Sequence, residues 1–275
     1  MKTPTGRGVV TPFKRRHPAL KFDDMHSDRI QTTMKRRRIP IWSEAKATQP
    51  REFEIRAIRP DEVHAAASMH FEFLGGPEVA RCSFLKLGFK FLEAFYRLNL
   101  DNPYFFALGA FMRGELIGLL VFTTDRRKMF KYLLQRHCGN LLFHFLVAFL
   151  RRPIPSGRYL IAKLRDDVPP DMRRVPAVLL LMLVRPEART KSFVGGTGLR
   201  IGKALIEATE AVLREKGCRE CWMETTVDNG QAYNLARGFG GKCVGEAVRQ
   251  GVLLRFIVVP VGETLAESPQ RTTAA

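Results

Sequence analysis

The sequence contains little cysteine, relatively few acidic residues and no long hydrophobic run. Its five cysteines are an odd number without a regular framework, which argues against a disulfide-stapled domain and for reduced thiols. The longest charge-free run, Cys138–Leu150, is shorter than the about 20 residues that cross a bilayer. No apolar segment of the kind found in signal peptides follows Met1. We therefore expect a cytoplasmic chain without a membrane-spanning segment.

The sequence also lacks the signatures of common metal and nucleotide sites. Cys218 and Cys221 have the spacing of a zinc-binding pair, but no second Cys/His pair stands at a suitable distance. Incidental core cysteines are favoured, because a free cysteine behaves as a small hydrophobe. No glycine-rich segment ends in Gly-Lys-Ser or Gly-Lys-Thr, and repeated βαβ units are missing. We expect neither a metal site nor a nucleoside triphosphate loop.

Basic residues outnumber acidic ones by 45 to 27, which gives a formal charge of +18. Residues 1–51 hold 13 basic and 4 acidic side chains, and 13 − 4 = +9 is half of the excess. They contain too few clustered apolar groups for a core, so we predict a disordered basic arm. A solvated arm is favoured over a tether to nucleic acid or to an anionic membrane. The predicted folded domain spans residues 52–260, and residues 261–275 form a flexible tail.

The most informative stretch runs from Val178 to Gly217. It begins with seven apolar residues, which is typical of a central strand buried on both faces beside a parallel neighbour. A glycine-rich turn with Gly195 and Gly196 follows, and then an apolar stripe predicts an amphipathic helix that stops at Gly217. The stripe consists of Ile201, Leu205, Ala208 and Val212. Because a glycine-rich turn before a helix lets backbone N–H groups converge on an anion, this unit predicts a site for a phosphorylated ligand.

The remaining segments predict further strands and helices. Strands are expected over residues 53–58, 159–163, 219–226, 242–246 and 251–259, with a β-hairpin over 104–112 and 115–124. Helices are expected from residue 60, over 84–99 and over 229–237. Residues 126–137 and 140–152 predict a helical insertion, an antiparallel pair that covers the sheet. An acceptor-binding cover or a helix docked on acidic lipid is the less favoured alternative, because apolar stripes more often bury than bind.

Three segments resemble the GNAT superfamily of N-acetyltransferases. They are Val184-Arg185-Pro186-Glu187-Ala188-Arg189, then Gly198-Leu199-Arg200-Ile201-Gly202-Lys203, and Asn229-x-x-Ala232 with Gly238-Phe239. They are similar to the family's entry to its acetyl-CoA pyrophosphate loop, its Gly-x-Gly helix start and its Asn-x-x-Ala helix. This chain has about seven extra residues, 190–196, and Arg200 replaces the central glycine. The order of elements over residues 52–259 is also similar.

The resemblance implies an α/β fold with a mixed, mostly antiparallel central sheet, helices on both faces and a splayed parallel strand pair. It implies transfer of an acetyl group from acetyl-CoA to an amine, without a metal. The implied cofactor-binding residues are Leu183, Val184, Arg189, Gly196, Gly198, Arg200, Ile201, Gly202, Lys203 and Asn229. Glu224 is the candidate base, with Asp228 second, and either is equally well a surface carboxylate. In the family, a tyrosine often protonates the departing thiolate. Counted from Asn229, its position is occupied here by Ala236, and Tyr233 is close to it in sequence.

From these residues we predict an acetyltransferase that acts on a small-molecule amine, such as an amino sugar or another metabolite. Two alternatives stay open. The acceptor is an amine of a protein or peptide, or the chain is a CoA-binding or interaction module without catalysis.

Overall fold

The structure, a computed structural model, describes residues 53–74, 84–157, 170–249 and 251–262. The basic arm, most of the tail and the strand predicted at 159–163 lie outside this range. The strands are β1 (Phe53–Ala57), β2 (Phe105–Met112), β3 (Glu115–Thr123), β4 (Ala177–Val184), β5 (Glu220–Thr226), β6 (Lys242–Arg249) and β7 (Val252–Pro260). The α-helices are α1 (Val63–Leu74), α2 (Phe89–Asn99), α3 (Arg126–Arg151), α5 (Lys191–Thr197), α6 (Ile201–Glu215) and α7 (Gly230–Gly238). Short 3-10 helices are η1 (Pro60–Glu62), η3 (Phe84–Leu87), η4 (Pro170–Arg174) and η5 (Pro186–Arg189).

The described strands form one seven-stranded sheet in the order β1-β2-β3-β4-β5-β7-β6. Every neighbouring pair is antiparallel except β4 and β5, which are parallel. The predicted mixed, mostly antiparallel sheet is therefore confirmed. The hairpin of β2 and β3 turns at Arg113 and Gly114, both with positive φ. Such a two-residue turn matches the twist of the paired strands, which is why Gly114 marked it in the sequence.

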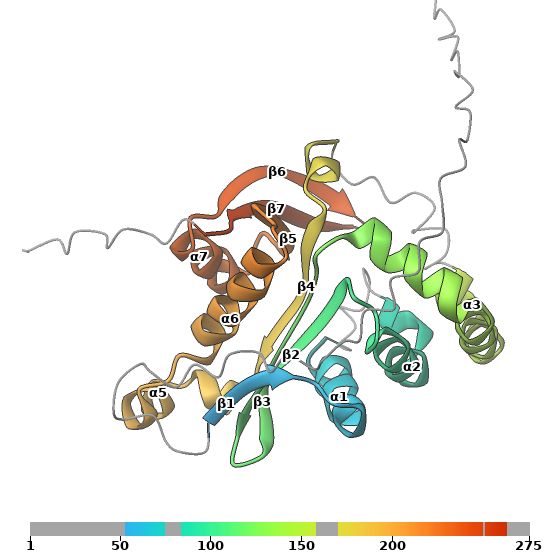
Figure 1. Ribbon diagram of the computed structural model, residues 1–275, viewed down its shortest axis with the longest axis horizontal. Coiled ribbons are helices and arrows are strands. Elements are labelled where there is room, and N and C mark those ends of the chain that lie inside the picture. The colour runs from blue at the N-terminus through green and yellow to red at the C-terminus, as the bar shows by residue number, and fades with distance from the viewer. Residues whose placement is uncertain (1–52, 75–83, 158–169, 250, 263–275) are drawn as a thin grey trace, which may run out of the picture. The chain divides into compact units, whose positions relative to one another are not determined.

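Helices cover both faces of the sheet, as predicted (Figure 1). On one face, α1 and α2 pack onto β2 and β3 through a core that contains Leu92, Tyr96 and Leu119. On the other face, α6 packs through Ile201 and Leu205. α7 lies on that same face over β5 and β7, where Ala236 contacts a smaller core. The alternation of side chains along each strand separates the cores, because successive residues point to opposite faces.

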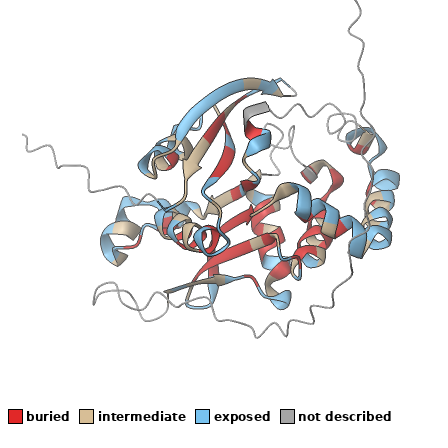
Figure 2. Cartoon of the chain, turned by 45° about the horizontal axis from the view of Figure 1, so that its top comes forward, coloured by how far each residue is buried: buried red, intermediate tan, exposed pale blue. Residues whose placement is uncertain are grey.

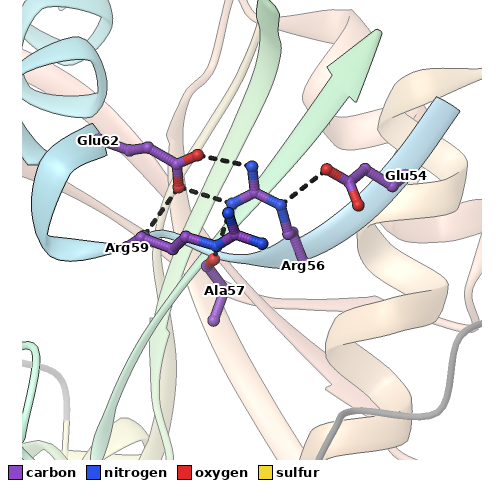
Figure 3. A network of polar contacts seen from close by, with 5 residues as sticks. All are labelled: Glu54, Arg56, Ala57, Arg59 and Glu62. Carbon is purple, nitrogen blue, oxygen red and sulfur yellow. Dashed lines mark hydrogen bonds and ion pairs between the residues drawn. The ribbon is translucent and has the colours of Figure 1, made fainter. Parts of the chain in front are cut away.

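A network of charged side chains fastens β1 to the turn that begins the first helical segment (Figure 3). Arg56 donates to the Glu62 carboxylate at 2.6 Å and to Glu54 at 2.8 Å. Its guanidinium also lies 3.8 Å from the ring centroid of Phe111. Hydrogen bonds from Arg56 hold the pKa of Glu62 below its usual value. The pair is only partly exposed, so it fixes the direction in which the chain leaves β1.

The predicted antiparallel pair over 126–152 is wrong. The chain forms α3, whose two parts are separated by a kink at His137 (φ −131°, ψ 22°) and not by a reversing turn. Only Met129 and Leu133 of its first part reach the main core. The second part packs on η3 and α2 instead of on the sheet. Gly139, the expected turn, lies inside the helix, since one glycine lowers helix stability without ending it.

Among the described residues, no helix is both long enough and apolar enough to cross a membrane.

Candidate functional site

The parallel strands β4 and β5 pair over only three residues and then separate. Their register runs from Ala177 opposite Cys221 to Leu179 opposite Met223, and no pair of these two strands follows it. On its other side β4 stays paired with β3 as far as Val184. The sheet therefore splays open at the carboxyl ends of β4 and β5. This opening confirms the predicted splayed pair.

The splay changes how β4 is buried. The sequence predicts a strand buried on both faces, yet Leu180 is 41% exposed and Met182, Leu183 and Val184 are only partly buried. The expectation is correct for the paired part, because Ala177 and Val178 are buried. Beyond Leu179, where the neighbouring strand has moved away, the expectation holds for Leu181, which is buried, and is wrong for Leu180 and for residues 182–184.

Backbone groups of β4 line the opening. Arg185 donates its N–H to the Ile117 carbonyl of β3 at 2.9 Å. Because N–H groups alternate in direction along a strand, Leu183 turns its N–H toward β3 and Val184 turns its own toward the opening. The Val184 N–H is thus a donor at the splayed edge, suited to an extended ligand or a developing oxyanion.

Helix α6 begins beside this edge with an uncapped N-terminus. Its N-cap residue, Arg200, makes no side-chain capping bond, and the first intrahelical bond of the backbone is from Ala204 to Arg200 at 3.0 Å. The first N–H groups of a helix lack intrahelical acceptors, so those of Ile201, Gly202 and Lys203 are available. Together with the helix dipole they form an anion site.

Gly202 brings the end of β4 and the start of α6 together with α7. A Cβ atom at this position would lie 4.0 Å from the Val184 side chain and 3.6 Å from that of Leu235. The open edge of β4 and the uncapped helix therefore belong to one site.

The glycine-rich turn predicted between β4 and α6 is in part a helix. Residues 190–196, which are extra relative to the family pattern, supply most of α5. Thr190 caps it by accepting from the Phe193 N–H at 3.1 Å, and Gly198 ends it in the left-handed region with φ 70°. Gly195 and Gly196 lie inside α5 and not in a turn. Gly198 alone supplies the positive φ that the connection needs.

Glu224 lies on the splayed part of β5, and its carboxylate accepts from Arg249 of β6 at 2.8 Å. Arg249 reaches Glu224 across β7, with its guanidinium 5.1 Å from the Phe256 ring centroid. The Glu224 side chain is 41% exposed, so it is accessible to a ligand. The sequence alone did not reveal Arg249, because only the β5-β7-β6 register brings the two residues together.

Tyr233 lies on the opposite face of β5. It packs beside Met223 in the small core under α7, and Met223 and Glu224 point to opposite faces. The Arg255 guanidinium lies 4.4 Å from the Tyr233 ring centroid. Glu224 and Tyr233 therefore border β5 from its two sides and do not form one cluster.

Asn229 caps α7, because its Oδ1 accepts from the Ala232 N–H at 3.1 Å. This bond is a structural reason for the Asn-x-x-Ala spacing. Asp228 precedes it as an exposed residue in the turn after β5.

The comparisons with known proteins agree with this geometry. Residues 196–240, from the last turn of α5 to just past the end of α7, match the family model described as "Acetyltransferase (GNAT) family". This segment of the chain is similar to the GNAT acetyltransferase family. Acetyl-CoA is the co-substrate typical of that family, and the GNAT fold is the splayed mixed sheet seen here. A comparison with curated protein sequences gives no match.

Solved structures of GNAT proteins are similar in outline. A GNAT-family acetyltransferase from Streptococcus pneumoniae is 14% identical, with a TM-score of 0.46, over 77% of this chain and 100% of that one. YncA from Salmonella typhimurium, solved with its cofactor acetyl-CoA, is 13% identical, with a TM-score of 0.47, over 79% of this chain and 99% of that one. The similarity to the GNAT family rests on the family model over residues 196–240 and not on these distant likenesses.

The GNAT site residues predicted from the sequence fall on adjoining segments. The end of β4 holds Leu183 and Val184, and η5 ends at Arg189. Gly198 ends α5, Arg200 is the N-cap residue of α6, and Ile201, Gly202 and Lys203 begin α6. Gly196 lies one helix earlier, in α5. Lys203 pairs with Glu207 at 3.6 Å, whereas Arg189 and Arg200 are exposed. The open β4 edge and the helix N–H groups fit the extended chain and phosphates of acetyl-CoA.

Cys218 and Cys221 are free thiols. Cys221 lies on β5 and is buried, and Cys218 precedes the strand and is partly buried. Burial raises the pKa of Cys221 to about 12. Within the residues that the structure describes, no group of three or more His, Cys, Asp or Glu side chains is arranged to hold a metal ion.

Proposed function

We propose that the protein transfers the acetyl group of acetyl-CoA to the amine of a small molecule, such as an amino sugar or a comparable metabolite. One observation carries this proposal. The opening between β4 and β5 adjoins the uncapped N-terminus of α6, so a thioester and a phosphate-bearing chain find donors side by side.

The positions of Glu224 and Tyr233 support a division of labour. An ammonium acceptor must lose a proton before its nitrogen can attack the thioester carbonyl, and Glu224 accepts that proton directly or through water. As the C–N bond forms, the Val184 N–H stabilises the oxyanion. The C–S bond then breaks, and Tyr233 gives its phenolic proton to the CoA thiolate. The second proton, which the nitrogen loses as the amide forms, returns through water to the Tyr233 phenolate. Since the two side chains border β5 from opposite faces, the amine enters from one face and the thiol leaves from the other.

The charge of the chain favours a small acceptor. A formal charge of +18 repels lysine-rich proteins at long range. Asp228, at the open end of β5, supplies a local negative charge that attracts a single ammonium group, while the charge of Glu224 is balanced by Arg249. An amine with few positive charges therefore fits better than a polycationic one.

Two measurements test the proposal in sequence. Isothermal titration of the full chain with acetyl-CoA should show one binding site, and a folded, ligand-free sample that binds none would contradict it. A free-thiol assay against pooled amines, amino sugars and peptides should then show turnover with the small amines. Binding with turnover on peptides alone would favour a protein acetyltransferase. Binding without turnover on any pool would favour a CoA-binding module.

A further inference from the structure

Helix α3 presents an apolar face to solvent. We call this face, formed by Leu142, Phe143, Leu146, Phe149 and Leu150, the α3 apolar face. Leu142 is 59%, Phe143 62%, Leu146 54% and Leu150 72% exposed. Leu142, Leu146 and Leu150 follow each other at intervals of four, so they form one row along the helix. In Figure 2 this helix, at the right, is coloured largely as exposed.

The same helix is also apolar on its packed side. Leu141, Phe145 and Ala148 contact Leu87 and Phe91 of η3 and α2. This contact fixes the rotation of the helix and turns the α3 apolar face outward. Rotation of α3 about its axis could not bury the exposed leucines without exposing the side that is now packed.

The first part of α3 adds to the exposed apolar surface. Phe130 is 42% and Leu134 51% exposed, again at an interval of four. Beyond the end of α3, Ile154 is 67% exposed. Large apolar surfaces of this kind mark interaction sites in folded proteins.

The charge of α3 has one sign. The helix contains the basic residues Arg126, Arg127, Lys128, Lys131, Arg136 and Arg151 and no Asp or Glu. All of them except Arg126 are exposed, and all except Arg151 lie in the part of α3 before the kink. An amphipathic helix with aromatic and aliphatic residues on one side and only basic charges beside them is typical of helices that lie in a membrane interface.

Charge complementarity selects the occupant. A second copy of this chain carries +18, and residues 1–51 carry +9, so both repel the basic surface of α3. Nucleic acid matches the charge, but leucine side chains offer it neither hydrogen bonds nor a stacking surface. An anionic lipid bilayer matches both features, since its headgroups attract the basic residues and its acyl region accepts the leucines.

We propose that α3 docks on the surface of an anionic lipid bilayer and lies in its interface without crossing it. The inference is independent of the proposed acetyl transfer. It places the protein at the membrane surface by two weak interactions, apolar insertion and charge attraction, which act together.

Co-flotation of the full chain with vesicles tests it. Binding is expected to vesicles with about 30% phosphatidylglycerol and not to pure phosphatidylcholine, and it should fall between about 0.1 M and about 1 M salt. The double variant Leu142→Gln/Leu146→Gln should bind at least about tenfold more weakly, because it removes inserted apolar groups. The affinity of Arg127→Gln/Lys131→Gln for the anionic vesicles should fall about fivefold for each charge that is removed.

A matched control is Val244→Gln/Val248→Gln, which changes two exposed apolar residues of β6 instead. It should bind vesicles like the wild-type chain, and circular dichroism should show all variants folded. Two results would overturn the proposal. One is the absence of binding to anionic vesicles. The other is equal binding by the wild type and the folded Leu142/Leu146 variant, which would assign the attraction to the basic arm or show that α3 is not used.

Discussion

Glu224 on β5 and Arg249 on β6 form an ion pair of 2.8 Å across the intervening strand β7. A similar pair stands close by, because Glu246 accepts from Arg255 at 3.0 Å. Both carboxylates are 41% exposed, but only Glu224 lies on the splayed part of β5. Glu224 is thus the candidate base, and Glu246 is a matched control because it has the same kind of partner and the same exposure.

The first prediction concerns these two glutamates. Glu224→Gln should lower kcat by about a hundredfold, since general base catalysis contributes at least that much. Affinity for acetyl-CoA should change little, and stability should fall by roughly 1–3 kcal/mol, because Arg249 is only 17% exposed and loses its charged acceptor. Steady-state kinetics, calorimetric titration and thermal melting measure the three effects. Glu246→Gln should retain wild-type kcat, and equal losses in both variants would argue against Glu224 as the base.

The second prediction concerns Gly198, which ends α5 with φ 70°. A Cβ there would meet nothing within 4 Å, so Gly198→Ala introduces only backbone strain. We expect a loss of stability of roughly 1 kcal/mol and weaker binding of acetyl-CoA, because the start of α6 shifts. Chemical unfolding and calorimetry measure both. Gly195→Ala is the control, since a glycine inside a helix should gain about 0.5–1 kcal/mol on becoming alanine. A neutral Gly198→Ala would mean that the turn tolerates a side chain.

The third prediction concerns His70, which is buried beside Tyr96, with 3.0 Å between Nδ1 and the phenol oxygen. Burial lowers the pKa of His70 to about 4 from 6.5. The unfolded chain therefore binds a proton more tightly than the folded one, so stability is full above pH 6.5 and falls as the pH approaches 4. The loss is on the order of 3 kcal/mol.

Urea unfolding of the wild type and of His70→Gln between pH 7 and pH 4 measures this effect as a difference. The variant starts less stable at pH 7, because its amide occupies a site shaped for a ring, but its curve should be flatter. Parallel curves would show that His70 is not the group responsible.

The fourth prediction concerns thiol reactivity. Only thiolates react readily, and burial raises the pKa of Cys221 to about 12, while Cys138 and Cys243 are exposed. Brief alkylation at pH 8 followed by peptide mass spectrometry should modify Cys138 and Cys243 and spare Cys221. In denaturant all of these thiols should react. Equal labelling of Cys221 and Cys243 in the native chain would show that β5 opens more readily than its packing implies.

Much of the fold could be predicted because its signals are local. The hairpin at Gly114, the apolar run of β4 and the stripe of α6 are each contained in one short segment. The turn before α6 was predicted less well. Glycine is common in loops but is also tolerated in a short helix, so Gly195 and Gly196 did not show which of the two they form. Its boundaries were set by the cap at Thr190 and the positive φ of Gly198.

Features that depend on distant parts of the chain could not be predicted. The pair of Glu224 with Arg249 needs the register of three strands, which no spacing in the sequence encodes. The exposed face of α3 was predicted as core, since an apolar stripe does not show whether a partner covers it. Leu146 and Phe145 are adjacent apolar residues, yet one faces solvent and the other the protein.

The brevity of the β4–β5 pairing also bears on how the protein folds. Strands β1 to β4 and strands β5 to β7 are each contiguous in the chain, so each half of the sheet comes from one continuous stretch of sequence. Only three residue pairs of parallel register join the halves within the sheet. We therefore expect each half to be able to gain structure without the other, because few backbone hydrogen bonds depend on the seam. A ligand that binds both β4 and β5 would therefore stabilise the junction between the two halves of the sheet.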